Sequence, residues 1–180
     1  MMRFSDKVAL VTGGRTGIGK AIADRLREEG ARVYTVQRGH DPDHECITAD
    51  LADPATPARV VAAIAEQAGR LDVLVNNAGI TRDNLMMRMK DEEWDDVLDV
   101  NMTASMMITR ACLRAMMKAR FGRIISISSI VGVTGNPGQA NYAASKAGMI
   151  GFSKALAAEV ASRGIAVNVC LLYTSPSPRD

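Results

Sequence analysis

Tyr142 and Lys146 are four residues apart, and this spacing could support proton transfer. In a helix, residues i and i+4 project from the same face, so the Lys146 ammonium would lie near the Tyr142 phenol. A free tyrosine has a pKa of about 10, and a nearby cation lowers that value because it favours the phenolate. Tyr142 could then act as a general acid. The alternative is that both side chains merely cover a helix surface.

A glycine-rich turn near the N-terminus could bind a phosphate group. Residues 7–11 read as a short buried strand, residues 12–19 contain the pattern Gly-x-x-x-Gly-x-Gly, and Ile22 and Leu26 then follow at helical spacing. Glycines permit a tight turn and close backbone approach to a pyrophosphate, and the helix N-terminus supplies free N–H groups. The sequence therefore predicts a dinucleotide-binding turn, with an ordinary glycine-rich turn as the alternative. The expected contacts are Gly13, Arg15, Thr16, Gly17, Ile18 and Gly19.

The end of the second expected strand predicts the cofactor. An acidic residue there would bind the ribose 2′-hydroxyl of NAD, whereas this chain has Gln37-Arg38-Gly39. The planar guanidinium of Arg38 can hold a 2′-phosphate, and Arg15 could add charge, so we expect NADPH. A solvated surface arginine is the alternative. His40 and His44 follow in a short connection that we expect to be a solvated loop, with no metal site in the chain.

Two further motifs complete the pattern. Asn76-Asn77-Ala78-Gly79 follows the apolar strand 73–75, and Asn101 precedes another helix. Together with the glycine-rich turn and the Tyr142–Lys146 pair, these motifs resemble the short-chain dehydrogenase/reductase family, from Val8 to about Val169.

The resemblance implies a role for each residue that matches a family motif. Tyr142 would protonate the developing alkoxide, Ser129 would hydrogen-bond the same oxygen, and Lys146 would hold the nicotinamide ribose and lower the pKa of Tyr142. Asn101, at a helix irregularity, would position a water molecule. Ser128 should point to the opposite face of its strand from Ser129. The cofactor would also contact Asp50, Leu51, Asn77, Ala78 and Gly79.

Residues 79–85, 89–94 and 138–148 are similar to family members that reduce 3-oxoacyl groups on acyl carrier protein in fatty-acid synthesis. That resemblance implies an NADPH-dependent reductase whose docking surface for the acidic carrier includes Arg120 and Arg163. Two other functions stay open. The chain could reduce acetoacetyl-coenzyme A or a small ketone, or it could be an inactive NADPH-binding fragment.

The order of elements predicts an α/β fold, namely one Rossmann-like, doubly wound parallel sheet with helices on both faces. We expect residues 1–169 to form this domain, without the family's C-terminal lid and last strand. The expected strands are 7–11, 32–36, 46–49, 72–75, 123–128 and 165–169, and the expected helices are 17–29, 54–68, 91–98, 101–119 and 140–162.

The remaining expectations come from the composition and from the C-terminal residues. The 180 residues carry a net charge of +2 and three cysteines without metal-ligand spacing, which favours neither nucleic-acid binding nor a disulfide framework and suits the cytoplasm. Residues 170–180 resemble a translated sequencing adapter, so we expect a non-native tail whose prolines prevent strand or helix formation. The resemblance implies a homotetramer for the complete protein, with Met106, Met107, Leu113 and Met116 among the expected partner-facing residues.

Overall fold

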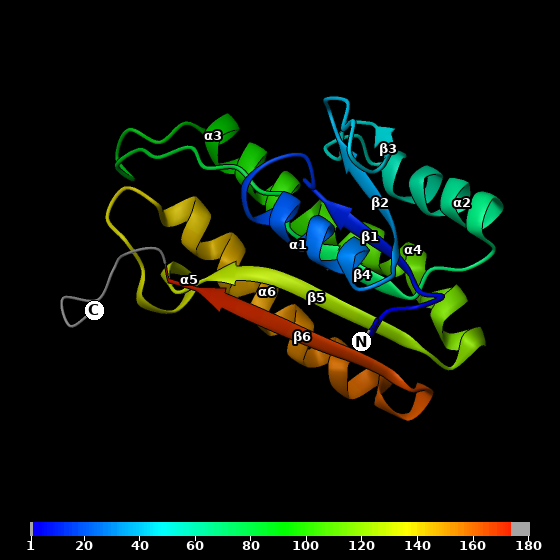
Figure 1. The fold of residues 1–180 in the computed structure, drawn as a ribbon. Coiled ribbons are helices and arrows are strands. Elements are labelled where there is room, and N and C mark those ends of the chain that lie inside the picture. The colour runs from blue at the N-terminus through cyan, green and yellow to red at the C-terminus, as the bar shows by residue number, and fades with distance from the viewer. Residues whose placement is uncertain (1, 174–180) are drawn as a thin grey trace, which may run out of the picture.

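The structure is a computed structural model that describes residues 2–173, so the part of the expected tail from residue 174 onward lies outside the described residues. Strands and helices alternate along the chain (Figure 1). The strands are β1 (Val8–Thr12), β2 (Arg32–Gln37), β3 (Glu45–Thr48), β4 (Val73–Asn76), β5 (Gly122–Ser129) and β6 (Ile165–Leu172). The helices are α1 (Gly17–Glu28), α2 (Thr56–Ala68), α3 (Asp91–Leu98), α4 (Ala104–Ala119), α5 (Val131–Thr134) and α6 (Ala140–Val160), with a π-helical turn at Asp99–Thr103 and a 3₁₀ turn at Ala161–Arg163.

The six strands form one parallel sheet in the order β3-β2-β1-β4-β5-β6. β1 lies inside the sheet, and all five of its residues are buried. A strand that is buried on both faces needs a continuous apolar run rather than an alternating one, and the β1 sequence Val-Ala-Leu-Val-Thr largely meets that need. The carboxyl ends of all the strands therefore point to one edge of the sheet.

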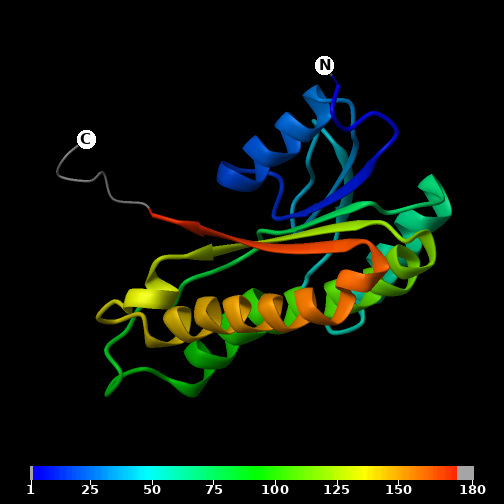
Figure 2. The same cartoon turned by 90° about the horizontal axis from the view of Figure 1, so that it is seen from below.

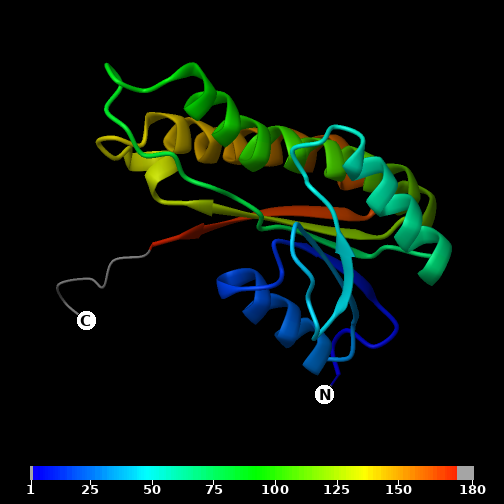
Figure 3. The same cartoon turned by 90° about the horizontal axis from the view of Figure 1, so that it is seen from above.

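Helices cover both faces of this sheet (Figures 2 and 3). α1 lies on one face, and α2, α4 and α6 lie on the other. The predicted doubly wound α/β fold is therefore confirmed.

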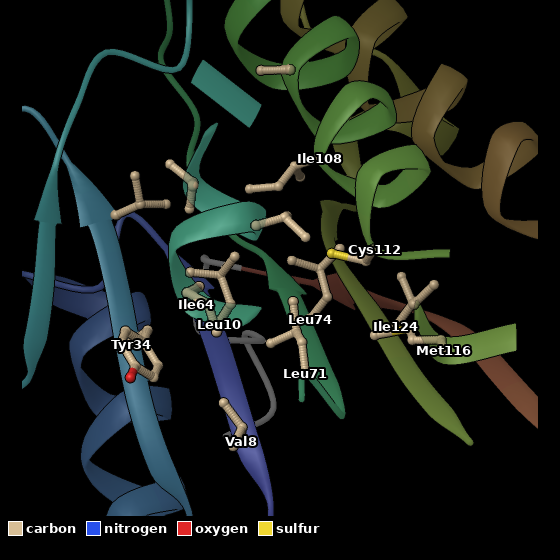
Figure 4. Packing of buried hydrophobic residues seen from close by; sticks show 14 of the residues in the cluster. Val8, Leu10, Tyr34, Ile64, Leu71, Leu74, Ile108, Cys112, Met116 and Ile124 are labelled. Atoms are coloured by element: carbon tan, nitrogen blue, oxygen red, sulfur yellow. The ribbon is translucent and has the colours of Figure 1, made fainter. Parts of the chain in front are cut away.

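The larger core lies between the sheet and the second group of helices (Figure 4). Leu10, Leu74 and Ile124 project from neighbouring strands, and Ile64 and Ile108 meet them from helices. All five side chains are fully buried. Burial of each is worth roughly 1.5–3 kcal/mol, so this layer fixes the sheet that carries the candidate site.

Two expected boundaries are wrong by three residues, whereas the others differ by two residues or fewer. The last strand continues through Leu172 rather than ending at Val169, because Ser129 at the end of β5 pairs with Leu172. The prolines that would stop a strand come only from Pro176 onward. The predicted helix 101–119 instead begins as a π-helical turn, which joins α3 to α4.

One expected partner-facing residue is also misplaced. Met116 is completely buried in the larger core, where it contacts Gly122 at the start of β5 closely enough that an added Cβ would lie 2.6 Å from its sulfur. Met116 therefore stabilises the protomer and cannot contact a partner. Met106, Met107 and Leu113 are half-buried, and their contact with another subunit stays a prediction.

Candidate active site

The glycine-rich turn is fastened to the end of β4 by a threonine and an asparagine. Thr12 Oγ1 accepts hydrogen bonds from the backbone N–H groups of Asn77 and Ala78, each at 2.9 Å. The Asn77 side chain donates to the carbonyl oxygens of Thr12 and Gly13 at 3.0 and 3.2 Å. The Asn-Ala-Gly segment thus holds the turn in a fixed position at the edge of the sheet.

Two glycines show why the turn excludes side chains. Gly13 has a φ of +67°, a conformation that favours glycine. A Cβ on Gly19 would lie 2.1 Å from the Gly13 carbonyl oxygen, so no side chain fits there. α1 begins at Gly17, and the first residues of a helix have N–H groups without intrahelical partners. This backbone fits a dinucleotide phosphate.

A cavity of about 300 Å³ extends from this turn over the ends of β2 and β3. Arg38 lines it and is exposed. The Arg15 guanidinium lies over Gly39, because an added Cβ at Gly39 would be 2.4 Å from its Nη1. The remaining expected contacts that line the cavity are Gly13, Asp50, Leu51, Ala78 and Gly79. Arg15 thus lies against the residue that follows Arg38, although only Arg38 of the two lines this cavity.

A second cavity, of about 290 Å³, brings together Ser129, Tyr142 and Lys146. Ser129 ends β5, while Tyr142 and Lys146 lie one turn apart on α6. Gly79 and Ile80 line both cavities, so the two spaces adjoin. A dinucleotide bound at the glycine-rich turn could therefore extend to the phenol.

Ser128 and Ser129 have different surroundings. The Ser128 hydroxyl donates to the carbonyl oxygen of Lys146 at 2.9 Å, which ties β5 to α6. The Ser129 hydroxyl accepts the backbone N–H of Val131 at 3.2 Å and lies beside Tyr142, where it lowers the pKa of the phenol. Both serines line the second cavity, and Ser129 is the one whose hydroxyl lies beside the Tyr142 phenol. Its contact with a reacting oxygen stays a prediction.

The prediction that Lys146 lowers the pKa of Tyr142 is wrong for this structure. Burial raises the pKa of Tyr142, and the opposing hydrogen bond from Ser129 does not cancel the increase. Burial also lowers the pKa of Lys146 to about 8. The Lys146 ammonium lies 5.5 Å from the centre of the Tyr142 ring and donates to the carbonyl oxygen of Ile127 at 2.9 Å. Tyr142 is therefore a neutral phenol at pH 7, which is the form that can donate a proton.

Asn101 lies in the π-helical turn and is almost completely buried. Its Oδ1 accepts the N–H of Ile80 at 2.7 Å, and its Nδ2 donates to the Ile80 carbonyl at 3.0 Å and to Ser145 Oγ at 3.1 Å. Asn101 therefore anchors the segment that separates the two cavities. Its role in positioning a water molecule stays a prediction.

Two residues of α6 were missed in the sequence. Ser145 Oγ donates to the Tyr142 carbonyl at 2.8 Å and accepts from Asn101, so it connects the helix to the π-helical turn. The Asn141 side chain donates to the carbonyls of Arg82 and Glu93, each at 3.0 Å. Both residues are completely buried polar side chains next to Tyr142 or Lys146, and that adjacency was the available signal.

Arg120 and Arg163 lie away from both cavities. Arg120 follows α4 and donates to the Ser162 carbonyl at 3.1 Å, and both arginines precede the starts of β5 and β6. Ser129 is at the opposite end of the eight-residue β5, roughly 23 Å away at the usual rise per residue. The structure does not bring these arginines to their own protomer's site, and carrier docking stays a prediction.

The expected solvated loop at His40 and His44 is only half correct. His40 is exposed, but the His44 side chain is 0% exposed, because it packs between Asp41 and Asp24 of α1. Within residues 2–173, no group of three or more histidine, cysteine or acidic side chains could hold a metal ion. None of the helices in this part of the chain combines the length and apolarity needed to span a bilayer.

Burial of Lys146 should lower the free energy of unfolding of the cofactor-free protein. Its pKa falls from 10.5 to about 8 on folding, which corresponds to about 3 kcal/mol. The unfolded chain binds more protons between these two pKa values, so the penalty is complete below pH 8 and disappears as the pH rises to 10.5. We expect Lys146→Met to increase the free energy of unfolding at pH 7 by about 1–3 kcal/mol, with no gain near pH 10.5.

Urea denaturation of the cofactor-free protein at both pH values measures this effect. Lys154→Met is the control, since Lys154 is exposed on the same helix and should change stability little at either pH. A Lys146→Met protein that is less stable than the wild type at pH 7 would contradict the expected burial penalty.

Comparisons with known proteins agree with this geometry. Residues 7–176 match the family model described as short chain dehydrogenase. The 3-oxoacyl-[acyl-carrier-protein] reductase FabG of Escherichia coli K12 is 53% identical over 178 residues, which cover 93% of this chain and 73% of that protein. FabG of Haemophilus influenzae is 53% identical over 91% of this chain and 72% of its own, and FabG of Staphylococcus aureus is 47% identical over 90% and 72%.

One family model thus matches most of the chain, and the matched residues include the glycine-rich turn, the residues that line the two adjoining cavities, and Ser129, Tyr142 and Lys146. The chain belongs to the short-chain dehydrogenase/reductase family.

Proposed function

We propose that the protein reduces 3-oxoacyl groups carried on acyl carrier protein to 3-hydroxyacyl groups, with NADPH as the reductant. The observation that carries this proposal is that Ser129, Tyr142 and Lys146 line a cavity that adjoins the cavity beside the glycine-rich turn. The similarity to three FabG reductases supports the choice of substrate.

The residues present fit NADPH. The turn at Gly13 and Gly19 leaves no space for side chains where a pyrophosphate would approach. Arg38 lines the cavity where a 2′-phosphate would lie, and Arg15 packs over the following Gly39. When bound, the cofactor supplies a hydride for the C3 carbonyl of the substrate. The family resemblance assigns Lys146 to its ribose hydroxyls, and the ammonium is close enough to Gly79 to meet an added Cβ at 3.6 Å.

Residues of this chain would then stabilise the negative charge that develops on the substrate oxygen and supply the proton. Ser129 donates a hydrogen bond to the carbonyl oxygen and stabilises the negative charge that forms on it. Tyr142 gives its proton to the same oxygen, and burial keeps the phenol protonated until then. Ser145 and Asn101 hold the Tyr142 backbone against the segment at Ile80. Asn101 is also proposed to position the water that restores the Tyr142 proton.

Substrate choice is tested by comparing three substrates. NADPH oxidation is measured with acetoacetyl-acyl carrier protein, acetoacetyl-coenzyme A and a simple ketone at equal concentrations. We expect the highest kcat/KM with the carrier-bound substrate. A higher value with acetoacetyl-coenzyme A or the ketone would assign the protein to another branch of the family, and cofactor binding without reduction of any of the three would indicate a binding protein.

The assembly and location belong to the same proposal. We propose that the protein forms a homotetramer, with the half-buried Met106, Met107 and Leu113 among the side chains that meet a partner. Arg120 and Arg163 are proposed to contact the acidic carrier. The cysteines are free, which fits the reducing cytoplasm.

Arg38→Asp should reverse the cofactor preference. The aspartate would repel a 2′-phosphate and could accept a hydrogen bond from a 2′-hydroxyl, so the ratio of kcat/KM for NADPH to that for NADH should fall at least about a hundredfold. Steady-state assays with each cofactor measure the ratio. Arg59→Asp is the control, because Arg59 is exposed on α2 and does not line the cavity. An unchanged ratio would move the phosphate contact to Arg15 or elsewhere.

A further inference from the structure

His44 joins the β2–β3 connection to α1 through two carboxylates. Its side chain is 0% exposed, with Nδ1 3.0 Å from Asp41 Oδ2 in the same connection and Nε2 3.3 Å from Asp24 Oδ1 on α1. This connection follows Arg38 directly and contains no helix. The imidazole, together with the Lys20–Asp43 ion pair, therefore links the segment that follows Arg38 to the helix that begins at the glycine-rich turn.

The two contacts differ in kind. Nδ1 and Asp41 Oδ2 form a hydrogen bond, whereas the buried Nε2 faces Asp24 Oδ1 without a hydrogen-bond partner among the described residues. The ring thus fills the space between a carboxylate of the connection and a carboxylate of α1, and a truncated side chain would deprive the buried Asp41 of this hydrogen bond.

Asp41 extends this connection to the glycine-rich turn. The carboxylate is 2% exposed and accepts from Thr35 Oγ1 at 2.9 Å. Burial would raise the pKa of Asp41, but the hydrogen bonds from Asp43 N, Thr35 and His44 keep it below its usual value. Gln37 donates to the same Thr35 oxygen at 3.1 Å and accepts the N–H of Gly14 at 3.1 Å. Displacement of Asp41 would therefore disturb the residues that flank Arg38.

The charges around the connection are compensated in pairs. Asp43 pairs with Lys20 at 2.5 Å, and Glu45 pairs with Arg32 at 2.6 Å. By contrast, no carboxylate within residues 2–173 lies at ion-pair distance from Arg15 or Arg38. Asp24 is also compensated, by Lys20 and Arg27 at 3.4 Å each. Among the described residues, Arg15 and Arg38 thus remain available for a phosphate.

We propose that His44 is a positioning residue for cofactor selectivity, which holds the β2–β3 connection on α1 so that Arg38 meets the 2′-phosphate of NADPH. This inference rests on the proposed NADPH dependence and adds a residue that does not touch the cofactor. A buried histidine would thereby help to hold in place a connection that has no helix.

The test is the selectivity of His44→Ala. Dissociation constants for NADPH and NADH are measured by fluorescence titration of the purified protein. We expect NADPH to bind about tenfold more weakly, as for the loss of one charge-assisted contact, and NADH to change less than about twofold. General destabilisation would weaken both cofactors equally. His40→Ala is the matched control, since His40 is exposed in the same connection and should leave both constants unchanged.

Asp24→Asn keeps the proposal testable if His44→Ala does not fold. It removes the charge that faces Nε2 and preserves side-chain size, and it should shift the same selectivity ratio about threefold in the same direction. Equal weakening of both cofactors, or an unchanged ratio in the variant that folds, would overturn the inference. If Arg38→Asp changes the ratio and the His44 and Asp24 variants do not, the inference fails alone. If Arg38→Asp also has no effect, the proposed cofactor fails with it.

Discussion

Replacement of Tyr142 by phenylalanine is expected to lower kcat by about 10²–10⁴-fold, because it removes the only phenolic proton that residues 2–173 place at the second cavity and leaves the ring in place. The dissociation constant for NADPH should stay within about twofold, since the hydroxyl contributes little to cofactor binding compared with the glycine-rich turn. Stopped-flow or steady-state reduction of acetoacetyl-acyl carrier protein, together with NADPH titration, measures both quantities.

Tyr34→Phe is the matched control for this variant. Tyr34 is a buried tyrosine on β2 that lies outside both cavities. Its replacement should leave kcat unchanged. A Tyr142→Phe enzyme that keeps activity within a few-fold of the wild type would remove Tyr142 from the proton-transfer step.

Gly19→Ala should have the second largest effect, because the new methyl group has no space. An added Cβ would lie 2.1 Å from the Gly13 carbonyl oxygen and 2.4 Å from Asn77 Nδ2, so the turn and its anchor must move apart. We expect about 1–3 kcal/mol less stability and at least about tenfold weaker NADPH binding. Urea denaturation and cofactor titration measure the two effects.

Gly151→Ala provides the comparison, since a Cβ at this helical position meets nothing within 4 Å. Alanine should there stabilise α6 by roughly 0.5–1 kcal/mol and leave NADPH binding unchanged. Normal cofactor affinity in Gly19→Ala would mean that the turn does not approach the pyrophosphate as the backbone geometry predicts.

The sequence predicted the parts of the site that depend on local patterns. The strand, turn and helix at 7–29 and the four-residue spacing of Tyr142 and Lys146 depend on chain-local geometry, so residue order was sufficient for them. The alternation that separated Ser128 from Ser129 is equally local. The overall α/β fold followed from the order of these elements.

The features that the sequence did not predict depend on tertiary contacts. The direction of the Tyr142 pKa shift follows from burial, which opposed the simple effect of a neighbouring cation. The extension of β6 follows from pairing with Ser129, and the burial of His44 follows from a carboxylate on α1. Ser145 acquires its function from Asn101, 44 residues earlier in the chain. No pattern within a short window contains these partners.

The inner position of β1 has a consequence for how the chain folds. β1 pairs on one side with β2, which follows soon after it, and on the other side with β4, whose neighbour Asp72 accepts the N–H of Val8 at 2.9 Å across 64 residues. Contacts of such sequence separation carry a loop-closure cost and slow folding. During synthesis, β1 through β3 can assemble first, but one hydrogen-bonding edge of β1 stays unpaired until β4 has left the ribosome. An unpaired strand edge is a site at which the early chain can associate with another chain.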